Sequence, residues 1–205
     1  MTERGRPTGE HGAASPRRRG RPVSQRARRA VLDAAAGLLD ERGFAGFTVD
    51  EVARRSAVSK ATIYKHWSGG FDIAVDAYGD SITGEVPVVS TGNVVADLTD
   101  QIQRLAAVYA GPRGRVVAQL LAAATVQDYA PELLRDKFFG TRRAATAALV
   151  ERGRHQGQLR ADLDPDLAID LLFGAVVFRL VNGSRPLTTR EAAALAAMAL
   201  RAVIA

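Results

Sequence analysis

The sequence predicts an all-α fold of about nine helices, with an N-terminal three-helix helix-turn-helix domain and a larger C-terminal helical domain. Apolar residues recur at helical spacing from residue 24 to the C-terminus, and strand-like alternation is almost absent. Two Ser/Thr cap candidates bracket a short turn near residue 57. We therefore divide the chain into an N-terminal arm (1–23), a helix-turn-helix domain (24–70) and a helical body (71–205).

The arm is rich in Gly, Pro, Arg and Ser and lacks apolar periodicity, so we expect it to be disordered when unbound. Residues 1–30 carry a net charge of +7, whereas residues 68–205 carry −1. Such an uneven distribution favours contact with the phosphates of DNA, through Arg17, Arg18, Arg19 and Arg21. A solubilising or cloning-derived tail is the alternative.

The first helix is predicted from Ser24 to Arg42, closed by Gly43 as a left-handed cap. Its buried stripe consists of Val31, Ala35, Leu38 and Leu39. Thr48 is the N-cap candidate of a second helix, and Glu51 stands at the position that completes a capping box.

Ser59 can cap a third helix, running through Ile63 to about His66. The turn over residues 56–58 has the length that sets two helices at roughly 90 to 120 degrees. Polar side chains remain on the outer face, where they can reach phosphates and base edges: Thr48, Ser59, Lys60, Thr62, Tyr64, Lys65 and His66. The alternative is a pair of ordinary core helices with a solvated face.

Residues 21–67, which read RPVSQRARRAVLDAAAGLLDERGFAGFTVDEVARRSAVSKATIYKHW, carry a resemblance to a known family. They resemble the DNA-binding domain of the TetR family of bacterial transcriptional regulators. The resemblance covers the first helix, the turn at Gly43 and Phe44, the start at Thr48 and the segment from Val58 to Tyr64. It implies that the helical body binds a ligand and forms a dimer.

Three positions depart from the family pattern. Ala57 stands where the family usually has glycine, so a positive φ there would cost on the order of 1 kcal/mol. Gly69 and Gly70 replace a Lys-Glu pair that commonly opens the fourth helix, so the phosphate contact of that lysine is missing.

The body is predicted as a series of helices. Phe71, Val75 and Tyr78 mark a fourth helix, and residues 84–92 form a loop. The next apolar stretches contain Leu98, Ile102, Leu105 and Val108 before Gly111-Pro112, and then Val116 to Val126. Pro131 opens a helix in which Leu134, Phe138 and Ala145 share a face until Gly153, followed by a polar turn, GRHQGQ.

The last two helices are predicted over residues 165–182, opened by Asp164-Pro165, and 189–204, capped by Thr189. Both are apolar over more than one face, which is typical of a subunit interface. The resemblance likewise implies a homodimer through this helix pair. The alternative is that the pair forms the core of a monomer.

Catalysis finds little support in the sequence. The three histidines, His11, His66 and His155, lie apart from any nucleophile-base arrangement or metal-ligand spacing, so we expect no enzyme, metal or cofactor. There is no cysteine, no secretory signal in the first 30 residues, and no apolar run of 18 residues. We therefore expect a cytoplasmic protein without a membrane partner.

The resemblance implies a pocket for a small-molecule effector inside the body. Polar or aromatic groups in apolar surroundings are the candidates to line it: Gln119, Thr125, Phe138, Arg142, Phe173 and Arg179. Ordinary packing is the alternative for each. Arg179 would favour an anionic ligand, but its guanidinium can equally reach solvent or pair across a dimer interface.

The functional hypothesis is a homodimeric repressor that a small-molecule ligand releases from a palindromic double-stranded DNA operator. A related regulator that activates transcription, or that lacks an inducer, is the first alternative. A helical protein-interaction module whose basic arm is incidental is the second.

Overall fold

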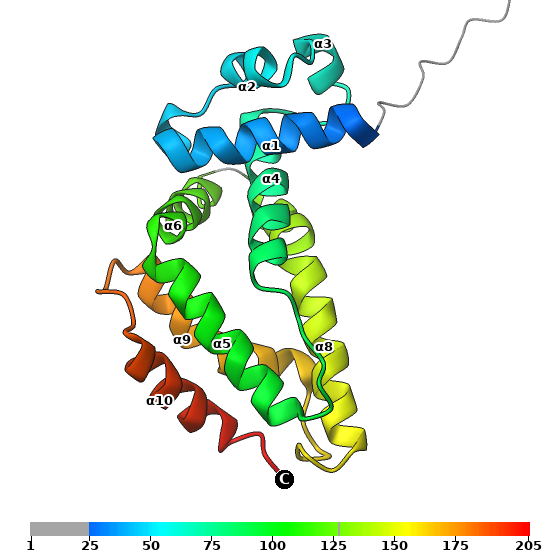
Figure 1. Cartoon of the computed structure of the whole chain (residues 1–205), viewed down its shortest axis with the longest axis vertical. Helices are drawn as coiled ribbons and strands as arrows, with labels where there is room; N and C mark the ends of the chain where they lie inside the picture. The colour runs from blue at the N-terminus through cyan, green and yellow to red at the C-terminus, as the bar shows by residue number, and fades with distance from the viewer. Residues whose placement is uncertain (1–24, 127) are drawn as a thin grey trace, which may run out of the picture.

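The computed structural model describes residues 25–126 and 128–205, and within them it is all-α (Figure 1). The first elements are α1 (Gln25–Arg42), η1 (Phe44–Gly46), α2 (Val49–Ser56), α3 (Lys60–Ile63) and α4 (Gly70–Glu85). The body continues with α5 (Val94–Ala110), α6 (Pro112–Ala124), α7 (Ala130–Leu133), η2 (Leu134–Phe139), α8 (Gly140–His155), α9 (Pro165–Val181) and α10 (Thr189–Leu200). Counting the uninterrupted run of α7, η2 and α8 as one helix and leaving out the short 3-10 turn η1, the described residues form nine helices.

Two hydrophobic cores meet at α4. One core joins α1, α2 and α3 through residues that include Leu38, Val52 and Ile63, and α4 adds Ile73 and Ala77 to it. The opposite side of α4 belongs to the core of the body, which α5, α6, α8, α9 and α10 complete. Because both sides of α4 are buried, this helix fixes the head, α1 to α3, on the body (Figure 1).

The first helix packs as its sequence predicts, because Val31, Ala35, Leu38 and Leu39 are all buried. Gly43 has a positive φ of 66°, but its ψ of −178° lies outside the left-handed helical region. That combination is open almost only to glycine. The residue type is therefore explained, although the expected left-handed cap is replaced by a different turn.

The helix that begins near Pro131 changes its geometry in η2, which is a π-helical turn. The backbone of η2 lies close to α4, since a Cβ on Gly79 would be 2.9 Å from the carbonyl oxygen of Lys137. A π turn adds a residue to the repeat, so the buried face shifts along the sequence. The buried face of α8 includes Arg142 and Thr146. Ala145, which was expected on that face, is exposed.

Three further boundaries differ from the sequence predictions. The α8 helix continues past the buried Gly153 to His155, so the polar turn begins later than expected. Thr188, not Thr189, caps α10, in a capping box with Glu191. The last helix ends at Leu200, and Ile204 then pairs with Leu159 in an isolated bridge.

Candidate nucleic-acid interface and interior cavity

The α2–turn–α3 unit begins with the two caps that the sequence predicts. The hydroxyl of Thr48 accepts a 3.3 Å hydrogen bond from the N–H of Glu51, and the hydroxyl of Ser59 accepts one of 3.2 Å from the N–H of Thr62. Ala57, between the helices, is left-handed with φ 55° and ψ 25°. The turn therefore has the positive φ for which glycine is the usual residue.

The capping box predicted at α2 is only half formed. The carboxylate of Glu51 accepts hydrogen bonds from Arg54, at 2.6 and 2.9 Å, and from Arg55, at 3.1 Å. These bonds, first from Arg54 and then from Arg55, lower the pKa of Glu51 to about 2. Arg55 also donates to Glu41 on α1, at 2.6 and 2.7 Å. The Glu51 carboxylate thus binds two arginines of its own helix instead of capping it, and Arg55 connects α2 to α1.

The third helix is held by its apolar side. Ile63 is fully buried in the core that α1, α2 and α4 also form, and Trp67 is buried in the same core. The indole N–H of Trp67 donates to Asp76 on α4 at 2.9 Å, and Arg28 on α1 donates to the same carboxylate oxygen at 2.7 Å. The α-helix ends at Ile63, short of the expected His66, and turns follow over residues 64–66.

The outer face of α3 and the following turn is polar and accessible. Tyr64 is 55% exposed. Its exposed polar neighbours are Ser59, Lys60, Lys65 and His66, and Thr48 is exposed at the start of α2. Thr62 is half-buried, with its hydroxyl 2.9 Å from that of Ser59. Donors of these types can contact phosphates and base edges.

Lys60 is paired on this face, because its Nζ lies 2.9 Å from a carboxylate oxygen of Asp50. An exposed ion pair of this kind contributes little stability, so a phosphate can compete with it. Arg17, Arg18, Arg19 and Arg21 lie outside the described residues.

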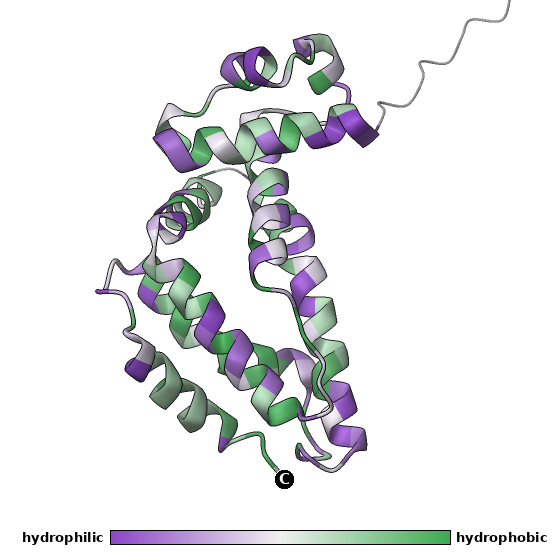
Figure 2. Ribbon diagram, in the orientation of Figure 1, coloured by the Kyte–Doolittle hydropathy of each residue, from purple (hydrophilic) through white to green (hydrophobic). Residues whose placement is uncertain are grey.

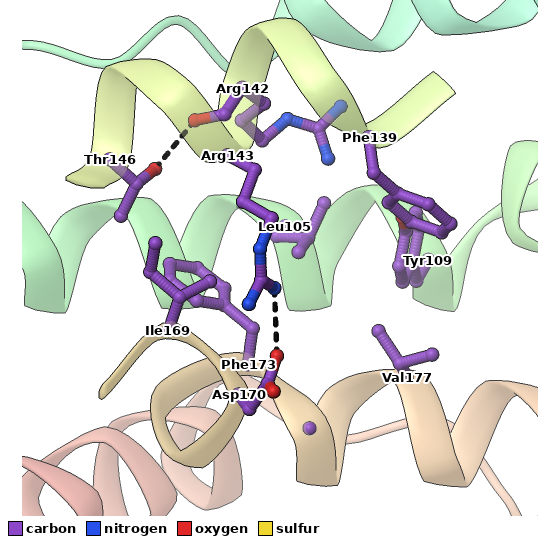
Figure 3. A pocket seen from close by; sticks show the side chains of 11 residues that line it. Leu105, Tyr109, Phe139, Arg142, Arg143, Thr146, Ile169, Asp170, Phe173 and Val177 are labelled. Atoms are coloured by element: carbon purple, nitrogen blue, oxygen red, sulfur yellow. Dashed lines mark hydrogen bonds and ion pairs between the residues drawn. The ribbon is translucent and has the colours of Figure 1, made fainter. Parts of the chain in front are cut away.

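A second site is a cavity of about 320 Å³ between α5, η2, α8 and α9, which opens to solvent beside the exposed Asp170 (Figure 3). Most of its lining is apolar. The residues that line it are Leu105, Tyr109, Phe139, Arg142, Arg143, Thr146, Ile169, Asp170, Phe173, Gly174 and Val177. A cavity of this size and character is typical of a small-molecule site.

Of the six candidate ligand contacts, Arg142 and Phe173 line this cavity. Phe138 is buried in the core, and Thr125 is exposed at the end of α6. Gln119 bonds to the backbone of Phe44 instead, and Arg179 lines a separate hollow next to the α9–α10 loop. These four residues therefore do not line the same cavity.

Sequence reasoning did not find the partners of Arg142. Thr146 lies one turn further along α8, and Tyr109 lies one turn beyond Leu105 on α5. Burial raises the pKa of the Tyr109 phenol, while the charge and hydrogen bond of Arg142 oppose that rise. Thr146 lies four residues after Arg142, and Tyr109 lies four residues after Leu105. This spacing, which places each pair on one helix face, could have identified Thr146 and Tyr109 as candidates from the sequence.

The last two helices leave apolar side chains uncovered. Phe178 is 66% exposed on α9, and Met198 is 57% exposed on α10. Leu167, Leu171 and Val181 are also exposed. At helical spacing they lie on the same side of α9 as Phe178. Both helices are apolar for most of their length (Figure 2). We name this stripe with Met198 the α9–α10 face.

Two classes of site are not found in the described residues. No group of three His, Cys, Asp or Glu side chains is placed to hold a metal ion. No helix there is long and apolar enough to cross a membrane.

A capped helix pair with an exposed polar second helix, carried on an all-α body, defines a DNA-binding regulator of the helix-turn-helix class. Residues 31–69 match the family model "Bacterial regulatory proteins, tetR family", and residues 88–199 match "Tetracyclin repressor-like, C-terminal domain". The chain belongs to the TetR family of bacterial transcriptional regulators.

Individual proteins are similar over most of the chain. The HTH-type transcriptional regulator YdeS of Bacillus subtilis is 38% identical over 164 residues, covering 80% of this chain and 83% of YdeS. The crystal structure of the TetR family regulator SCO0332 matches with a TM-score of 0.79 and 33% identity, covering 87% of this chain and 99% of that one. The A-factor receptor protein of Streptomyces griseus is 26% identical over 144 residues, which are 70% of this chain and 50% of that protein.

Proposed function

We propose that this TetR-family regulator is a homodimeric repressor, released from a palindromic DNA operator by a small-molecule ligand. The observation that carries the proposal is the exposed α9–α10 face. It lies in the same chain as α3, whose outer face is polar and exposed. Two copies joined through this face place two heads about a two-fold axis, the symmetry of a palindrome. In this proposal the head (24–70), the body (71–205) and the arm (1–23) have separate roles.

In the proposed DNA complex, Lys60 and Lys65 contact phosphates, and Thr62 and Tyr64 lie against the backbone or base edges. Thr48, Ser59 and His66 border this contact. The exposure of Tyr64, Lys65 and His66 supports this assignment. The arm, through Arg17, Arg18, Arg19 and Arg21, adds phosphate contacts that carry no sequence information.

Ligand control is supported by the cavity between α5, α8 and α9 and by the name of one relative, a receptor for A-factor. A ligand dissociates the complex only if it binds more tightly to a dimer state whose heads do not match the groove spacing. We place the protein in the cytoplasm, where bacterial DNA is found. We propose no catalytic activity.

The test is a gel-shift measurement on the DNA upstream of the gene. The double variant Tyr64→Ala, Lys65→Ala should bind at least about tenfold more weakly than the wild type, since a lost specific contact costs roughly 1–3 kcal/mol. Arg160→Ala, at an exposed position in the loop between α8 and α9, is the control and should bind like the wild type. An affinity of the double variant within twofold of the wild type would contradict the assignment of the reading face.

The sign of regulation is tested with a reporter gene on the same DNA. Expression should rise when the regulator gene is deleted. A fall in expression would support the alternative, an activator of the same family. Binding of the chain to a protein partner with no affinity for any DNA would support an interaction module.

A further inference from the structure

The cavity holds a cation that has no counter-ion among the described residues. Arg142 is only 7% exposed, and its Nε and Nη2 atoms have no hydrogen-bond partner there. The adjacent Arg143 differs, since it donates to Asp166 at 2.9 Å and to Asp170 at 2.7 Å. Figure 3 shows the two arginines entering the cavity from the same helix. The cavity therefore has an excess of positive charge at Arg142.

A buried guanidinium without a partner is costly, because it has lost its hydration and gained no charge of opposite sign. Apolar side chains from three helices surround it, among them Leu105, Phe139 and Phe173. In such surroundings the attraction between Arg142 and an anion is stronger than it would be in water. An anion in the cavity would offset the cost of burying Arg142.

The two free nitrogens specify the shape of that anion. The N–H groups of Nε and one Nη point in the same direction on one edge of a guanidinium, and they match the two oxygens of a carboxylate. The hydroxyl of Thr146 donates to the carbonyl oxygen of Arg142 and accepts from Gln101, so it is already occupied. The phenol of Tyr109 lines the same cavity as Arg142, and its O–H can donate a hydrogen bond to a ligand.

We propose that the effector of this cavity is an apolar carboxylic acid, bound as its anion. Nε and Nη2 of Arg142 are covered in this structure, so on binding the side chain turns to present them to the two carboxylate oxygens, and the phenol of Tyr109 donates a further hydrogen bond. The hydrocarbon part of the effector lies against Ile169, Phe173 and Val177. This inference rests on the proposed ligand control, and it names the chemical class of the ligand.

A phosphate ester or a neutral molecule fits the cavity less well. A phosphate dianion needs more than one cation in an apolar cavity, and the second arginine, Arg143, is already paired with two carboxylates. A neutral ligand would leave the charge of Arg142 without a counter-ion. A carboxylate carries the single negative charge that one free arginine can balance. Its two oxygens also match the paired N–H groups of Arg142.

The test compares matched acids and amides on the purified full-length protein. Binding of 2-naphthoate and decanoate is measured by calorimetry against 2-naphthamide and decanamide. At least one acid should bind the wild type at least tenfold more tightly than its amide. In Arg142→Met the affinity for that acid should fall on the order of 10- to 100-fold, because two hydrogen bonds to a charged group are lost. Affinity for the amide should not fall.

Two further variants separate this result from a general disturbance of the fold. Arg142→Lys keeps the charge but lacks the paired donors, and it should also lose most of the preference for the acid. Arg179→Met, outside the cavity, should keep the preference. Without any additive, the melting temperature of Arg142→Met should equal or exceed that of the wild type, since an uncompensated buried charge has been removed.

Equal binding of acids and amides by the wild type, or binding of neither, would overturn the proposal. A preference for acids that survives in Arg142→Met would overturn the role of Arg142. Release of operator DNA is measured separately. An acid that binds through Arg142 without releasing DNA would support this inference and contradict ligand control.

Discussion

The side-chain Oε1 of Gln119 accepts a 2.7 Å hydrogen bond from the backbone N–H of Phe44. This bond joins α6 in the body to the turn that follows α1 in the head. The two groups are so close that a Cβ on Gly43 would lie 2.8 Å from the same oxygen. The junction between head and body therefore depends on a polar contact as well as on the apolar packing of α4.

Replacing this glutamine tests the junction. Gln119→Leu should lower the free energy of unfolding by about 1–2 kcal/mol, since the N–H of Phe44 is left without an acceptor in a partly buried position. Gln119→Glu keeps an acceptor oxygen and should lose less. Urea denaturation measures both. Equal losses in the two variants would show that the hydrogen bond is not the cause.

The turn of the helix-turn-helix unit contains a strained backbone conformation that a glycine would relieve. Ala57 has φ 55°, so Ala57→Gly should raise the free energy of unfolding by roughly 0.5–1 kcal/mol, after the greater flexibility of glycine in the unfolded chain is subtracted. Ala61→Gly is the matched control and should lower stability, because this residue is in a helix. A loss of stability in Ala57→Gly would contradict the account of the turn.

Stability should fall in acid because Glu51 and Glu191 have a pKa of about 2 in the folded chain. The usual glutamate pKa is about 4.5, so the unfolded chain takes up protons first as the pH decreases. Their contribution is complete above about pH 4.5 and is lost as the pH falls toward 2.

The variant Glu191→Gln removes one of these groups, whose pKa is lowered chiefly by Arg185. Its melting temperature should change less between pH 6 and pH 3 than that of the wild type. Glu132→Gln, an exposed position on α7, should behave like the wild type. An unaltered pH dependence in Glu191→Gln would contradict the ion-pair explanation.

The α9–α10 face is tested by a charge in its centre. Phe178→Glu should convert a dimer at micromolar concentration into monomers, because association would bury an unpaired carboxylate. Val89→Glu places the same charge in the loop after α4 and should remain dimeric. Sedimentation velocity distinguishes the two forms. A Phe178→Glu protein that sediments like the wild type would exclude this face as the interface.

Local rules predicted most of the head and the order of the helices in the body. The caps at Thr48 and Ser59 and the buried stripe of α1 depend on near neighbours, so their patterns are visible in the sequence. Glu51 was misjudged because Arg54 and Arg55 compete for its carboxylate. That competition depends on side-chain positions that a spacing rule does not contain.

The cavity was predicted only in part for a similar reason. Arg142 and Phe173 could be predicted as cavity residues because they are polar or aromatic groups in apolar surroundings. The π turn of η2 lies against α4, and after it Thr146 is on the buried face and Ala145 is exposed. Tyr109 becomes a cavity residue only through the crossing of α5 with α8 and α9, which no single helix encodes.

Selection of binding sites from a pool of random DNA duplexes tests the central claim, a dimer that reads DNA with two heads. The wild-type chain should enrich an inverted repeat whose half-sites lie about one helical turn, or a multiple of it, apart. The Tyr64→Ala, Lys65→Ala variant should enrich no such repeat. Enrichment of a single unrepeated half-site, or of no sequence at all by the wild-type chain, would contradict the account.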